Sequence, residues 1–233
     1  MKKLIIQIVV IMLCMFAISL PAWAGWVLVE QDGQKNLISK GRIKTVPPDA
    51  SEGWSVMDFK KGQILIVNFE DKTYTQASLD QFCKSMQQLK AKIKGMMSKD
   101  DQQKKPAKIE VIKEGPGGEI AGFKTEKYKV MMDGQLYEEV WLTTEPEFIK
   151  DFNPAMLTKL MTCAAEDQDV ENSPAYQKMV ASGWLLRSID YEGGQADTQT
   201  DVVKVTKQDI AESEFAVPQG LKKTSIENMI MGQ

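Results

Sequence analysis

The strongest constraint on the fold is a β-hairpin that we predict over residues 120–143, IAGFKTEKYKVMMDGQLYEEVWLT. Asp133-Gly134 lies between two runs that are rich in aromatic and β-branched residues. This dipeptide is typical of a two-residue type I′ turn, because both central positions need a positive φ. Apolar residues alternate along both arms, which indicates an antiparallel sheet with one well-buried face. The glycine-rich stretch 115–118 indicates another turn and therefore predicts a strand at 108–114 before the hairpin.

The sequence around this hairpin predicts an α+β protein. Residues 26–75 are predicted to form a run of strands, one of them spanning Asn36 to Val46. Residues 78–98 are predicted to form an amphipathic helix that begins with a capping box of Ser78 and Gln81. After the hairpin, Pro146, Pro154 and Pro174 each stand where the first turn of a short helix accepts proline. Strand-rich segments with inserted helices favour the α+β class.

One predicted strand, residues 63–69, is apolar on both of its faces. Ile64, Leu65, Ile66 and Val67 follow one another without a polar residue, so both sides of this strand should be covered. Two arrangements would satisfy this pattern. Helices could cover one face while a hydrophobic cavity covers the other, or the strand could belong to an ordinary sandwich core.

The first 24 residues are predicted to be a cleaved signal peptide. Lys2 and Lys3 form a positive segment, Leu4 to Leu20 is apolar, and Ala22-Trp23-Ala24 fits a small-x-small cleavage site. The alternative is an uncleaved membrane anchor, but the apolar run is short and ends at Pro21. We therefore expect cleavage after Ala24, a single domain over residues 25–233, and a secreted, periplasmic protein with no stable membrane span.

Two cysteines remain after this cleavage, Cys83 and Cys163. In an oxidising compartment an even pair of cysteines is a candidate disulfide. Two separate buried thiols are the alternative, because the sequence does not give the distance between them.

The residue types present argue against most catalytic sites. The chain has no histidine, which excludes Ser-His-Asp and Cys-His catalysis and histidine metal sites. No phosphate-binding or dinucleotide-binding loop is present. The acidic run 166–171 does not fit a calcium loop, because Asn172 replaces the required glycine and Lys178 replaces the bidentate glutamate. We therefore expect no enzyme activity, no cofactor and no metal.

Two further observations argue against a catalytic carboxylate pair and against a nucleic-acid partner. Glu138 and Glu139 are adjacent on a predicted strand, so they should point to opposite faces and should not act as a carboxylate pair. Without residues 1–24 the formal net charge is −5, and the only arginines are Arg42 and Arg187. An acidic chain with few arginines argues against nucleic acid as a partner.

A resemblance to a known family rests on three short stretches that occur in order along the chain. These are Met57-Asp58 through Lys72-Thr73-Tyr74, then AGFKTEKY at 121–128 followed by Glu139-Val140-Trp141, and the closing Phe215-Ala216-Val217-Pro218. Through them, residues 26–221 resemble a domain of unknown function found in exported bacterial proteins and grouped by fold with the outer-membrane lipoprotein carrier LolA. The resemblance implies a LolA-like fold, in which a strongly curved antiparallel sheet forms an open half-barrel with helices packed on its concave side.

This resemblance also implies a function. We expect a periplasmic, non-catalytic binding or carrier protein for a lipid, an acyl chain or another apolar ligand. The alternative is a cell-envelope protein-interaction or sensor module without a small-molecule ligand. The candidate ligand-binding residues are apolar or aromatic side chains of the central strands, and ordinary core packing is the competing interpretation for each of them. They are Ile64, Ile66, Tyr128, Val130, Met132 and Trp141.

Overall fold

The computed structural model describes residues 24–96, 106–164, 168–192 and 194–231. Residues 1–23 of the predicted signal peptide lie outside the described residues. Residues 97–105, which precede the hairpin, also lie outside the described residues, as do Glu166 and Asp167 of the acidic run. No helix in the described parts of the chain has the length and the apolar composition that a membrane span requires.

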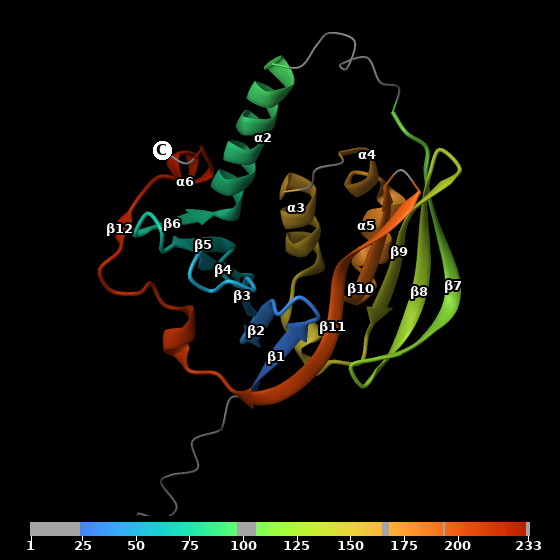
Figure 1. The fold of residues 1–233 in the computed structure, drawn as a ribbon, viewed down its shortest axis with the longest axis horizontal. Helices are drawn as coiled ribbons and strands as arrows, with labels where there is room; N and C mark the ends of the chain where they lie inside the picture. Colours follow the sequence, from blue (N-terminus) through green and yellow to red (C-terminus); the bar gives the residue numbers. More distant parts are fainter. Residues whose placement is uncertain (1–23, 97–105, 165–167, 193, 232–233) are drawn as a thin grey trace, which may run out of the picture.

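The described strands form one mostly antiparallel, open sheet in two wings (Figure 1). The N-terminal wing contains β1 (Ala24–Glu30), β2 (Lys35–Ser39), β3 (Arg42–Val46), β4 (Gly53–Asp58), β5 (Gln63–Asn68) and β6 (Thr73–Ser78). The second wing contains β7 (Ile109–Ile120), β8 (Phe123–Met132), β9 (Gln135–Thr143) and β10 (Trp184–Glu192). A short strand, β12 (Lys222–Lys223), pairs in parallel with β6 at one edge, and β7 forms the other edge.

The long strand β11 (Gln195–Asp209) connects the two wings. Its residues 195–201 pair with β10, whereas its residues 202–209 pair with β1. Each wing therefore pairs with a different half of the same strand. The pairing register shifts at Ser188/Ile189 in β10 and at Val29/Glu30 in β1, close to the point where β11 changes partner. Strands that change sheets in this way produce corners. Figure 1 shows β11 bending as it passes from one wing to the other.

Four of the helical elements between the two wings follow the predicted starts, and the helix at Gln168–Glu171 was not predicted. These elements are α2 (Leu79–Met96), the 3-10 helix η2 (Glu147–Asp151), α3 (Pro154–Ala164), α4 (Gln168–Glu171) and α5 (Pro174–Val180), and they occupy the space that the wings enclose in Figure 1. The capping box of α2 is confirmed, since Gln81 N donates to Ser78 Oγ at 3.2 Å and Ser78 N donates to Gln81 Oε1 at 3.0 Å. Together with the sheet, these helices confirm the α+β class.

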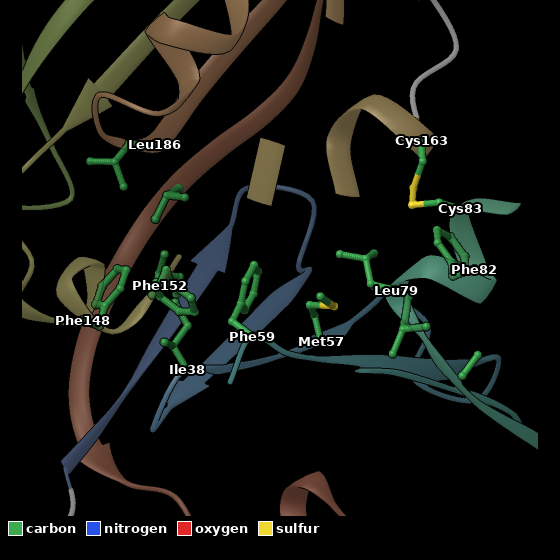
Figure 2. Close-up of a cluster of buried hydrophobic side chains, with 14 of the residues drawn as sticks. Ile38, Met57, Phe59, Leu79, Phe82, Cys83, Phe148, Phe152, Cys163 and Leu186 are labelled. Atoms are coloured by element: carbon green, nitrogen blue, oxygen red, sulfur yellow. A yellow bond between two sulfur atoms is a disulfide. The ribbon is translucent and has the colours of Figure 1, made fainter. Parts of the chain in front are cut away.

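Two apolar clusters lie between the helices and the sheet. The first fills the space under α2, α3 and η2, and Figure 2 shows it running from Phe148 and Phe152 at one end to Phe82 and the cysteine pair at the other. The second lies under α4 and α5 and includes Val130, Val140 and Met179. The sheet and its helices thus share one interface with two separate cores.

The opposite face of the N-terminal wing is covered by the C-terminal segment, residues 210–221, which includes the 3-10 helix η3 (Glu212–Phe215). Phe215 packs there against Val56, Leu65 and Val67. Ile64 of the same strand belongs to the first cluster on the helix side. The burial of β5 on both faces therefore comes from helices on one side and this C-terminal segment on the other.

The type I′ hairpin turn is confirmed, because Asp133 and Gly134 have φ of 51° and 81°. The turn predicted at residues 115–118 is wrong. Strand β7 continues through these residues to Ile120 by means of register shifts at Lys113/Gly115 and Pro116/Gly118, which are typical of bulges in an edge strand. The single strand predicted from Asn36 to Val46 is also wrong. It is a hairpin of β2 and β3, because Lys40 and Gly41 both adopt positive φ.

A short helix, α6 (Ile226–Met231), ends the described chain. The sequence places a capping pair at Thr224 and Glu227. In the structure Ser225 takes this role, since its Oγ accepts a hydrogen bond from Asn228 N at 3.2 Å. Glu227 instead accepts a hydrogen bond from Ser85 of α2 at 2.8 Å, which ties α6 to that helix.

Candidate functional site

The candidate site is the region where α3 and α5 meet the sheet. Helix α3 has the sequence PAMLTKLMTCA, with Lys159 as its one charged residue. Yet its large apolar side chains are only partly buried. Leu157 and Leu160 pack against the first cluster, whereas Met161 packs against the second. Helix α3 thus lies at the junction of the two cores and keeps apolar surface that neither core fully covers.

Helix α3 is tied to α2 by Cys83 and Cys163, whose Cα atoms are 5.1 Å apart and which form a disulfide. Lys90 of α2 donates to the carbonyl oxygen of Cys163 at 3.0 Å. Lys159 also forms an ion pair with Asp80 at the start of α2. These links hold α3 to α2. On its other side, Met161 of α3 packs against the second cluster, which includes Met179 of α5.

The crevice between α3 and α5 is narrow in this structure. It encloses about 10 Å³, which is room for about one water molecule. Its lining combines methionine, valine and hydroxyl groups with Glu171 and Tyr176. An acyl chain would fit between these helices only after one of them moves.

Two other hollows lie nearer the N-terminal wing. One holds about 150 Å³ over an aromatic floor of Trp26 and Phe148, with Lys40 and Lys207 among its charged rim. The other holds about 100 Å³ beside Phe215. Both are small beside the roughly 300–1,000 Å³ that is typical of a small-molecule site.

The feature of this region with most chemical interest is a buried acid, Glu138 on β9. The residue is 6% exposed and lies beneath α5, where it hydrogen-bonds with Tyr176. Its Oε2 atom has no hydrogen-bond partner. Burial, followed by the nearby charges of Asp190 and Glu171, raises the pKa of Glu138 to about 8. The same burial, together with Glu138, raises the pKa of Tyr176.

The next residue, Glu139, lies in a contrasting environment on the other face of β9. Lys127 Nζ lies 2.6 Å from its Oε1 and Tyr191 Oη donates to its Oε2 at 2.8 Å. Burial alone would raise the pKa of Glu139, but these two hydrogen bonds lower it. The prediction that Glu138 and Glu139 point to opposite faces is therefore confirmed.

The predicted ligand-binding residues do not gather around one cavity. Ile64 and Ile66 belong to the first cluster, and Val130, which is fully buried, belongs to the second with Tyr128 and Met132 beside it. The sixth predicted residue, Trp141, is buried in the first cluster. Lys127 and Arg187 lie over its ring at 4.8 and 5.9 Å.

The sequence analysis missed Tyr176 and Asp190 as neighbours of Glu138. One signal was available, because Glu138 occupies a place in the alternation of β9 that Val140 and Leu142 continue with apolar residues. An acid at such a position is an informative exception. Among the described residues, no three His, Cys, Asp or Glu side chains gather so as to hold a metal ion.

These observations define an α+β protein with a large open sheet, with helices on one face and the acid Glu138 buried under one of them. The chain belongs to the family described as a domain of unknown function (DUF4412), whose model matches residues 39–221. A comparison with curated proteins found no match.

Proposed function

We propose that the protein is a periplasmic, non-catalytic binding or carrier protein for a lipid or another apolar ligand. The observation that carries this proposal is the partly covered apolar surface of α3 at the junction of the two cores. Fully packed helices bury such side chains, so an apolar surface left between two cores is suited to an apolar guest. The ligand would enter between α3 and α5, where Met161 of α3 packs against the second cluster.

The architecture supports this proposal. The two wings diverge where β11 changes partner, and the helices occupy the side that both wings face (Figure 1). We propose that this arrangement is the LolA-like half-barrel, with α2 to α5 on its concave side. Methionines line both cores, including Met57 and Met86 in the first and Met161 and Met179 in the second. Methionine adapts to irregular shapes, which suits a flexible chain as ligand.

The test is direct detection of a bound molecule. Native mass spectrometry of the protein purified from a bacterial periplasm, with organic extraction, should find a stoichiometric lipid or apolar molecule. A fluorescent fatty acid should bind to the emptied protein, and Leu160→Gln should weaken that binding at least tenfold. Lys159→Gln is the matched control, because its side chain is exposed on the same helix, and it should bind normally. An empty protein that also takes up no probe would overturn the proposal.

A second candidate, a protein-interaction module of the cell envelope, is favoured by one observation. Strand β7 ends the sheet, and its Ile112 is 47% exposed. An open strand edge can accept an extended segment of another protein. Substituting Ile112 with lysine should abolish partner binding under this hypothesis, while leaving fatty-acid binding at α3 unchanged.

A further inference from the structure

We infer that α4 and α5 form a proton-dependent cover over the second apolar cluster, held closed by the neutral carboxyl group of Glu138 against Tyr176. The cover is defined here as residues 170–180. The inference goes beyond the proposed function, since it concerns how one wall of the region opens and not what binds there.

The contact beneath the cover is built from one hydrogen bond and apolar packing. Tyr176 reaches from α5 to Glu138, and Val170 and Met179 pack against the same cluster with exposed fractions of 0% and 3%. The remaining oxygen of Glu138, Oε2, faces no donor. The hydrogen bond from Tyr176 favours the ionised carboxylate, but burial has the larger effect and raises the pKa of Glu138. An ionised carboxylate there would lack a second hydrogen bond in an apolar setting, so the neutral form suits the closed cover.

The charges around Glu138 all oppose its ionisation. Asp190 of β10 is its direct cross-strand partner, and Glu171 of α4 lies close enough to raise its pKa. Its partner on β8 is the apolar Val130. No lysine or arginine of the described chain forms an ion pair with Glu138. Loss of its proton therefore adds a negative charge beside those of Asp190 and Glu171.

The cover is the part that can relieve this repulsion. Glu138 and Asp190 are fixed by the ladder between β9 and β10, whereas Tyr176 and Glu171 lie on helices of seven and four residues. Helices this short have little stability without tertiary packing. The N-cap residue of α5, Ser173, makes no side-chain cap hydrogen bond. Movement of α4 and α5 admits water to Glu138 at a smaller cost than disruption of the sheet.

Opening would uncover Val130, Val140 and the inner side of α5, next to the partly exposed Met161 of α3. If the proposed function holds, this is the surface that an apolar ligand would reach. A ligand would then enter more readily when Glu138 is ionised. The raised pKa of about 8 places this change in the mildly alkaline range.

Hydrogen exchange measured by mass spectrometry tests the cover on the purified protein without any ligand. Rates for residues 170–180, corrected for the intrinsic pH dependence of exchange, should rise at least tenfold between pH 6 and pH 9. Rates within α2 should stay constant. Glu138→Gln should abolish the rise in the cover, whereas Glu139→Gln, on the opposite face, should keep it.

A second variant keeps the inference testable if Glu138→Gln does not fold. Asp190→Asn removes the like charge opposite Glu138, so the midpoint of the rise should move to lower pH. A wild-type protein whose cover shows no pH-dependent exchange, or a Glu138→Gln variant that keeps the full rise, would overturn the inference. Because no ligand is present, a failure of fatty-acid binding would reject the proposed function and leave this result standing.

Discussion

Glu138 and Asp190 lie directly opposite each other on the neighbouring antiparallel strands β9 and β10. Like charges in this relationship destabilise a sheet when both are ionised. Glu138 is buried beneath α5, and burial together with Asp190 raises its pKa to about 8. The stability of the protein is thereby linked to pH through the protonation of Glu138.

The first prediction concerns that link. The pKa of Glu138 is higher in the folded protein than its ordinary value of 4.5, so the folded state holds the proton more tightly. Its contribution to stability is complete below pH 4.5 and falls as the pH rises to about 8, by at most about 5 kcal/mol. Glu138→Gln should remove this decline. Urea unfolding at pH 5, 7 and 9 measures this decline. The prediction would be contradicted if the free energy of unfolding changed equally with pH in the variant and the wild type.

Glu139→Gln should have the opposite pH signature. Lys127 and Tyr191 lower the pKa of Glu139 below 4.5, so its ionised form stabilises the folded protein at neutral pH. This stabilisation is lost as the pH falls through the lowered pKa. The variant should therefore be less stable than the wild type at pH 7 and should approach it at pH 3. Thermal unfolding across this range checks the sign, and a deficit that grows in acid would refute it.

Removing the disulfide should weaken the attachment of α3 to α2. Cys83 and Cys163 are separated by 80 residues, and cross-linking a loop of that length stabilises by about 4 kcal/mol on the chain-entropy model. The double variant Cys83→Ser/Cys163→Ser should lose about that amount in urea unfolding. Adding reductant should destabilise the wild type but leave the double variant unaffected. Identical responses to reductant would show that the bond does not contribute.

The C-terminal segment should be a structural part of the core. Phe215 is 7% exposed, packs on β4 and β5, and lies beneath the Arg42 guanidinium at 4.2 Å from its ring. Phe215→Ala should cost about 3–5 kcal/mol, in the range for truncating a buried phenylalanine. Val203→Ala is the control, because that side chain is 53% exposed and should change stability by about 0.5 kcal/mol or less. Equal losses in the two variants would argue that the segment is not packed in solution.

The hairpin turn offers a local prediction. Gly134 has a φ of 81°, so Gly134→Ala should lose about 1–2 kcal/mol. Gly134→Asn should lose less, since asparagine tolerates this conformation. Urea midpoints measured side by side give the ranking. The turn assignment would fail if alanine and asparagine had equal effects.

Features with a local cause were predictable from the sequence. The Asp133-Gly134 turn and the Ser78/Gln81 capping box each depend on residues close together in the chain. The path of the chain through residues 115–118 was not predictable, because glycines that favour a turn also allow a strand to bulge at a sheet edge. The first half of strand β11 was not predictable either, since its residues are polar and flank Gly194 without an apolar period.

The candidate site was less accessible to sequence reasoning. The opposite faces of Glu138 and Glu139 follow from the alternation of a strand. The surroundings of Glu138 do not, because Tyr176 and Asp190 come from elements far along the chain. The same distance hides the division of the ligand candidates between two cores, with Trp141 buried in the first and Val130 in the second.

The partnership of β1 with β11 also sets the order in which the protein can be completed. Ala24 pairs with Asp209, so one edge of β1 stays unpaired until β11 has been synthesised. Until then β1 can complete only its pairing with β2, and its other backbone edge is open to unrelated chains. Pairings this distant in sequence form slowly. The two wings can therefore join only after β11 has been synthesised. Truncation before residue 202 would leave two unjoined half-sheets.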